Sequence, residues 1–165
     1  MKIGELLLQG FDHEMRGTRA TLERVPASGA DFKPHGKSMP MGRLAAHVAR
    51  LPQFLVTILT TPALDLGAVA WPPLVFESRE KLLADFDALA AEARRILAGA
   101  TEAQLEERWK LSWGERVLAE APRAVLFHGV FLGHLIHHRA QLGVYLRLND
   151  LPVPSLYGPT ADDAG

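Results

Sequence analysis

The chain has 165 residues, 48% of them hydrophobic and 22% charged, a balance typical of a globular domain rather than a disordered or fibrous chain. Its 18 Lys and Arg nearly cancel its 19 Asp and Glu, and the absence of a basic stripe with interleaved aromatic residues argues against a nucleic acid partner. The sequence contains no cysteine, which excludes disulfides, thiolate nucleophiles and cysteine-rich zinc sites, so any bound metal must be held by nitrogen and oxygen.

The first predicted element is a helix over residues 2–24, where apolar residues recur at spacings of three and four. Charges interrupt its apolar stretch, so the segment does not resemble a signal peptide. After a loop rich in Gly and Pro, Ser38 and Pro40 indicate the start of a second helix over residues 39–61. Pro52 predicts a kink or a break inside that helix, because proline lacks the N–H group and crowds the preceding turn.

Residues 62–77 mix Pro, Gly and apolar residues without a helical period, which predicts a crossover loop. Ser78 is a suitable N-cap for a third helix over residues 78–98. A short helical piece and an extended stretch are expected next. Pro122 suits the first turn of a fourth long helix over residues 120–148, and a proline-rich tail occupies residues 149–165.

Four long helices without a repeated strand pattern predict an all-α fold, a four-helix bundle with long crossover connections. No apolar run approaches the roughly 20 residues that cross a bilayer, so a membrane is not an expected partner. We therefore expect a single domain over residues 1–165, located in the cytoplasm.

The strongest chemical signal is a group of histidines on the predicted fourth helix, in the segment HLIHHRAQ. His134 and His138 are four residues apart, about 40° around a helix, so both imidazoles can address one point. Phe131 and Tyr145 fall on the same face, which predicts that this face points inward. On the second helix His47 also lies among apolar residues. Neutral imidazoles that meet in this way are common ligands of Zn, Ni, Cu and Fe.

The residues alone leave a second interpretation open, in which no metal binds and the histidines are hydrogen-bonded members of the core. Among the other histidines, His137 is predicted to lie beside the ligands or at an interface, and His128 to be structural. His13 and His35 are predicted to be solvated. Leu135 stands where the HExxH motif of zinc proteases requires Glu, and no Glu is followed by His three residues later, so zinc proteases and di-iron bundles are not supported.

The segments GRLAAHVARL, around His47, and HLIHHRAQLGVYLRLNDLPVPSLYGPTADD, from His134 onward, resemble the DinB family in their residues and their order. That family is named for a damage-inducible gene. The resemblance implies a four-helix bundle, a homodimer, and one divalent ion, nickel or zinc, held by His47, His134 and His138. Ala140 stands where the family often has Gly, a difference that concerns helix packing rather than the ligands.

The same resemblance implies a metal-dependent enzyme, because related families include bacillithiol transferases and mycothiol-dependent isomerases. The implied activity is that of a hydrolase or a thiol S-transferase that uses a low-molecular-weight thiol and a small electrophilic substrate. A non-catalytic metal-binding or stress-related binding protein is the alternative. No general base can be identified. Candidates to line a cavity are Gln141, Tyr145 and Trp113, and candidates to contact a second subunit or cap the core are Trp71, Leu74 and Val75.

Overall fold

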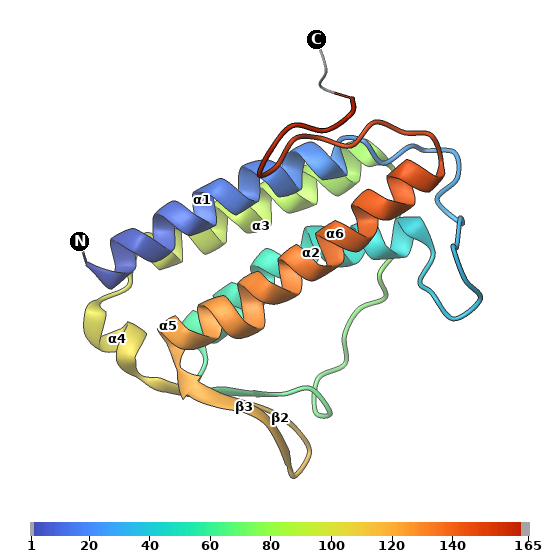
Figure 1. The fold of residues 1–165 in the computed structure, drawn as a ribbon. Coiled ribbons are helices and arrows are strands. Elements are labelled where there is room, and N and C mark those ends of the chain that lie inside the picture. Colours follow the sequence, from blue (N-terminus) through green and yellow to red (C-terminus); the bar gives the residue numbers. More distant parts are fainter. Residues whose placement is uncertain (1, 163–165) are drawn as a thin grey trace.

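The computed structural model describes residues 2–162 and is mostly helical, with a small sheet at one end (Figure 1). Three long helices and one composite helical segment pack along one another. The long helices are α1 (Ile3–Leu22), α2 (Met41–Thr60) and α3 (Arg79–Gly99). The composite segment consists of α5 (Arg123–Leu126), the π-helix η1 (Phe127–Leu132) and α6 (Gly133–Leu148), and the short helix α4 spans Glu102–Glu106.

Local sequence explains where these helices begin and which faces they bury. Leu7 and Phe11 of α1, one turn apart, are buried in the core. The Ser78 hydroxyl caps α3 by accepting the Lys81 backbone N–H at 3.1 Å. In α2 the helix continues through Pro52, so of the predicted kink or break the break is wrong. The Pro52 ring is buried, and packing around α2 holds the helix together where one backbone hydrogen bond is missing.

A three-stranded sheet corrects the all-α prediction. Its strands are β1 (Ala63–Asp65), β2 (Arg108–Trp113) and β3 (Arg116–Pro122), with β1 parallel and β3 antiparallel to the central β2. Residues 120–122, predicted as the start of the fourth helix, belong to β3. The sheet forms because Trp109 and Leu111 of β2 alternate with exposed residues and are buried, while Gly114, with φ of 57°, makes the tight turn to β3.

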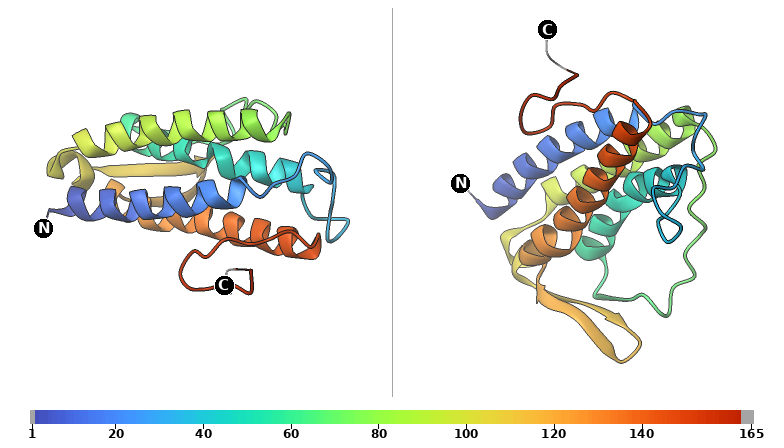
Figure 2. Two further views of the ribbon diagram at one scale, coloured as in Figure 1. Left: turned by 90° about the horizontal axis from the view of Figure 1, so that it is seen from above. Right: turned by 45° about the vertical axis from the view of Figure 1, so that its right-hand side comes forward.

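The C-terminal tail folds back across α1 and α6 (Figure 2). A buried ion pair between Arg139 of α6 and Glu14 of α1, at 2.6 Å, lies beneath it. The Tyr157 hydroxyl of the tail donates to the Glu14 carboxylate at 2.8 Å and accepts a hydrogen bond from Arg139. The tail is thus attached to two helices through hydrogen bonds from Tyr157 to a buried ion pair. Among residues 2–162, no helix combines the length and the apolar character needed to span a bilayer.

Candidate metal centre

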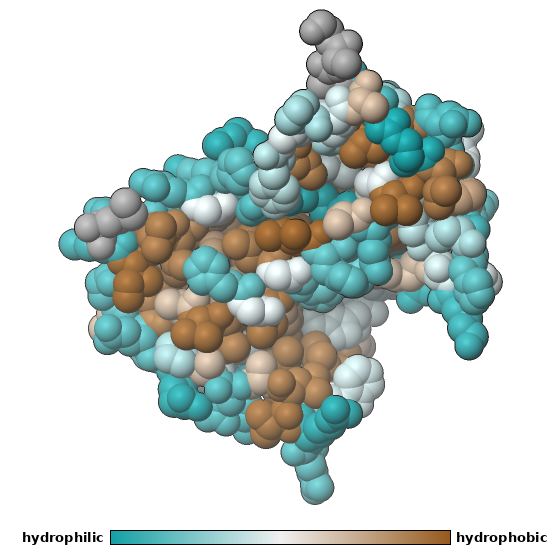
Figure 3. Space-filling model, in the orientation of Figure 1, coloured by the Kyte–Doolittle hydropathy of each residue, from teal (hydrophilic) through white to brown (hydrophobic). Residues whose placement is uncertain are grey.

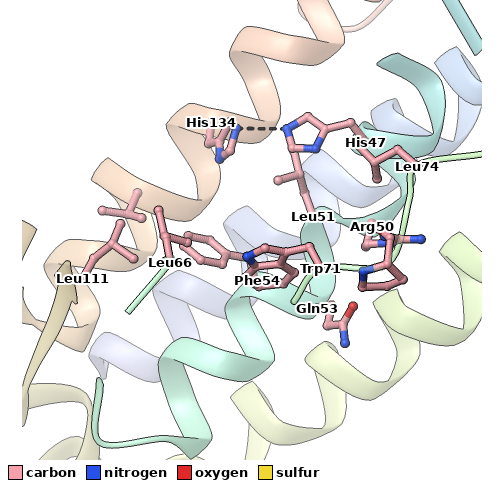
Figure 4. A pocket seen from close by; sticks show the side chains of 12 residues that line it. His47, Arg50, Leu51, Gln53, Phe54, Leu66, Trp71, Leu74, Leu111 and His134 are labelled. Atoms are coloured by element: carbon pink, nitrogen blue, oxygen red, sulfur yellow. Dashed lines mark hydrogen bonds between the residues drawn. The ribbon is translucent and has the colours of Figure 1, made fainter. Parts of the chain in front are cut away.

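The three histidines that the sequence singles out meet between α2 and α6. Nε2 of His47 lies 3.1 Å from Nε2 of His134, and the close approach is drawn as a dashed line in Figure 4. One ring nitrogen from each of His47, His134 and His138 lies within 4.8 Å of the others. The structure therefore brings all three side chains to one point from two helices.

The spacing of these nitrogens suits a shared divalent ion. Two nitrogens bonded to one tetrahedral ion at about 2.1 Å are about 3.4 Å apart, close to the observed separation of the His47 and His134 nitrogens. Among the described residues, no fourth His, Cys, Asp or Glu joins the group. Three protein ligands with an open position are the pattern of catalytic zinc sites, whereas structural sites are closed by four.

The π-helix η1 ends two residues before His134 and sets the rotation of α6. Along this segment buried residues recur every four positions at Phe127, Phe131, Leu135 and Arg139, a longer step than the roughly 3.6 residues of an α-helical turn. The wide turn of η1 accommodates the longer step, and the Gly133 N–H donates five residues back to the His128 carbonyl. As a result His134 is half-buried at the edge of the core instead of pointing into its centre.

The electrostatic environment keeps the histidines neutral. Burial lowers the pKa of His47 and of His134 to about 4, because a charged imidazolium loses its solvation there. Burial is the largest cause of these shifts; repulsion from His138 contributes to both, and Arg50 contributes to that of His47. Neutral imidazole is the form that binds a metal ion.

Gln141 orients the third histidine. Its amide oxygen lies 2.8 Å from Nδ1 of His138, and because that oxygen can only accept, Nδ1 carries the proton. Nε2 of His138 therefore keeps its lone pair, the arrangement found where a second residue fixes a metal-binding histidine. Burial lowers the pKa of His138, and the hydrogen bond to Gln141 opposes that effect in part.

A cavity of about 340 Å³ opens beside His47 and His134 (Figure 4). Its polar lining consists of those two histidines, Arg50 and Gln53. Three further lining residues share the face of α2 that carries His47, because Arg50, Leu51 and Phe54 follow it by three, four and seven positions. The remaining lining residues are apolar and come from the sheet, from η1 and from the crossover: Leu66, Trp71, Pro72, Leu74, Leu111 and Val130.

The three predicted cavity residues do not line this cavity. Trp113 is 63% exposed at the end of the β2–β3 hairpin, Gln141 binds His138 instead, and Tyr145 is buried in the core. In their place the crossover contributes Trp71 and Leu74. The aromatic pattern in the sequence could not predict that Trp71 and Leu74 line the cavity, because contacts with residues distant in the sequence determine the position of the crossover.

The other histidines lie outside the cluster. His13 and His35 are exposed, as predicted. His137 is also exposed, with its ring 4.8 Å from that of His138, and His128 is exposed beside Phe127. Ala140 is exposed as well, so the methyl group at the position often occupied by Gly meets no tight packing within the chain.

Comparisons with known proteins identify the family and the fold. The model of the DinB superfamily matches residues 10–142. The fold is similar to that of a DinB-like protein from Bacillus cereus, with a TM-score of 0.72 and 19% identity over 93% of this chain and 97% of that one. A DinB-like protein from Bacillus subtilis gives a TM-score of 0.70 and 19% identity over 92% and 97% of the two chains. No curated protein matches this chain.

Proposed function

This chain belongs to the DinB superfamily, and we propose that it is a metal-dependent enzyme in which His47, His134 and His138 hold one divalent ion, nickel or zinc. The observation that carries the proposal is the meeting of three neutral imidazoles, two of which line an apolar cavity, without a fourth protein ligand among the described residues. In this proposal the four long helical segments form a four-helix bundle around the site.

Each part of the site has a role in the proposal. A divalent ion held there would act as a Lewis acid and lower the pKa of a water or a thiol. Gln141 holds His138 in the tautomer that presents Nε2. The apolar walls offer water few hydrogen-bond partners on one side of the site. No Asp or Glu lines the cavity, which favours a reaction that needs no carboxylate base, such as transfer of a low-molecular-weight thiol to a small electrophile.

Metal content tests the site directly. Untagged protein analysed by mass spectrometry is expected to hold one equivalent of nickel or zinc per chain, and the double variant His134→Ala, His138→Ala is expected to hold none. The matched control is His35→Ala, His128→Ala, which removes two exposed histidines and should leave the metal content unchanged. Wild-type protein without metal, even after reloading, would contradict the proposal.

Turnover distinguishes an enzyme from a binding protein with the same site. Metal-loaded protein is incubated with low-molecular-weight thiols and an electrophile, and thiol consumption is compared with that of the His134→Ala, His138→Ala variant. Faster consumption by the wild type supports thiol transfer. Consumption equal to the protein-free control, with metal bound, would favour the non-catalytic metal-binding protein instead.

A further inference from the structure

The cavity beside the histidines has a composition that selects among ligands. We infer that it binds a small hydrophobic molecule with an anionic head group, whose apolar part fills the cavity and whose head lies near Arg50 and the histidine cluster. One part of the inference rests on the proposed function: a head group that binds the metal ion requires the proposed metal site. The cavity itself is tested separately.

The size and walls of the cavity define the apolar part. A volume of about 340 Å³ is about eleven times the share of one water molecule in the liquid, which suits a ligand of roughly ten non-hydrogen atoms. Leu51 and Phe54 of α2 form one wall, and Trp71 and Leu74 of the crossover form another (Figure 4). Water gains few hydrogen bonds against such walls, so an alkyl or aromatic group displaces it favourably.

The charge of the lining defines the head group. Arg50 is the one lining residue with a permanent charge, and no acidic residue lines the cavity. Its guanidinium donates to the carbonyl oxygens of Pro72 and Pro73, at 2.8 and 3.3 Å, and no ion pair of Arg50 occurs among the described residues. The positive charge is therefore not neutralised by a carboxylate, and it favours an anion over a cation.

The crossover wall provides a way to fill the cavity without changing the helices. Leu74 lines the cavity, whereas the next residue, Val75, is 58% exposed and does not line it. Both residues lie in the same loop, outside every helix and strand. Leu74→Trp should fill the cavity. Val75 borders a neighbouring pocket instead, so Val75→Trp adds the same side chain outside the cavity and serves as the matched control.

The first experiment measures the affinity of metal-loaded protein for a series of linear alkanethiols, from ethanethiol to pentanethiol, by isothermal titration calorimetry. Burial of each methylene should raise the affinity about fourfold. Leu74→Trp should abolish this dependence on chain length, and Val75→Trp should preserve it. If the wild type binds the alkanethiols with an affinity that does not depend on their chain length, the inference is overturned.

The second experiment uses chelator-treated protein with phenylacetate and 2-phenylethanol, two ligands of similar size of which only the first is charged. NMR titration of the Trp71 indole signal should show that phenylacetate binds more tightly, and Leu74→Trp should abolish binding of both. Arg50→Met should weaken phenylacetate about tenfold, the loss expected for a charged hydrogen bond, and Arg50→Lys should restore most of it. If the wild type takes up no metal even after reloading but still binds phenylacetate, the cavity is supported and the metal site is refuted. Equal affinity for the two ligands would refute the anionic head group.

Discussion

The buried ion pair between Arg139 and Glu14 gives the most direct test of what stabilises the fold. The side chains of Arg139 and Glu14 are only 2% and 9% exposed. Arg139 also donates to the Glu14 carbonyl and the Thr18 hydroxyl, both at 3.1 Å. Arg139→Met keeps much of the volume of the side chain but removes all of its donors. The Glu14 carboxylate then remains buried without its cation.

Removal of one partner from a buried ion pair costs about 3–5 kcal/mol, mainly because the remaining charge has lost its solvation. We therefore expect Arg139→Met to lower the free energy of unfolding by that amount. The matched control is Arg147→Met on the same helix. Arg147 also reaches the tail, through Asp162 at 2.9 Å, but the side chains of that pair are 48% and 25% exposed. A pair of this kind contributes about 0–1 kcal/mol.

The measurement is urea unfolding, followed by circular dichroism at neutral pH with chelator present in all samples. The double variant Glu14→Leu, Arg139→Met should recover much of the loss, because it removes the stranded carboxylate as well. Equal costs for Arg139→Met and Arg147→Met would refute the reasoning, since burial would then have no effect on the strength of the pair.

The histidines predict how metal-free protein responds to acid. The pKa of His47 and of His134 falls from 6.5 to about 4 on folding, so the unfolded chain binds protons at a higher pH than the folded chain. The free energy of unfolding therefore decreases as the pH falls from 6.5 to about 4. The expected loss is about 1–3 kcal/mol after allowance for partial exposure of the two side chains. Urea unfolding of wild type and His47→Gln, His134→Gln across this range should give a shallower pH dependence in the variant, and identical slopes would contradict the assignment. We also expect the homodimer implied by the family resemblance to use the exposed face of α6, where apolar surface is visible and Val144 and Leu148 are 58% and 56% exposed (Figure 3). Val144→Glu should then give monomers in sedimentation equilibrium, whereas a monomeric wild type would contradict this expectation.

The sequence predicts the parts of the site that depend on local periodicity. The four-residue spacing of His134 and His138 places both rings on one side of a helix, and the apolar neighbours of His47 turn it toward the interior. The polar cluster of Arg139, Glu14 and Tyr157 was not predicted. Its members lie far apart in the sequence, and neither an arginine on a helix nor a tyrosine in a tail signals that the two form hydrogen bonds with a buried carboxylate.

The cavity walls and the sheet depend on long-range contacts that periodicity does not encode. The crossover is held by hydrogen bonds from Arg50 to the backbone of Pro72 and Pro73, and no side-chain pattern in the crossover reveals them. The sheet gains its parallel strand from Ala63–Asp65, a segment too short to show alternation. The π turn of η1 was likewise hidden, because the apolar residues around it also fit an unbroken α-helix over short distances.

The position of Arg139 next to His138 links the tail to the candidate metal centre. Adjacent residues in a helix point about 100° apart, so α6 presents His138 toward His47 on α2 while Arg139 reaches Glu14 on α1. A helix held on two sides resists rotation about its axis, and the ion pair therefore helps to fix the orientation of His134 and His138. Arg139→Met should consequently weaken zinc binding in a competition assay with a chromogenic chelator, while Arg147→Met should not. Unchanged affinity in Arg139→Met, measured under conditions where the variant is folded, would show that packing against α2 alone orients the histidines.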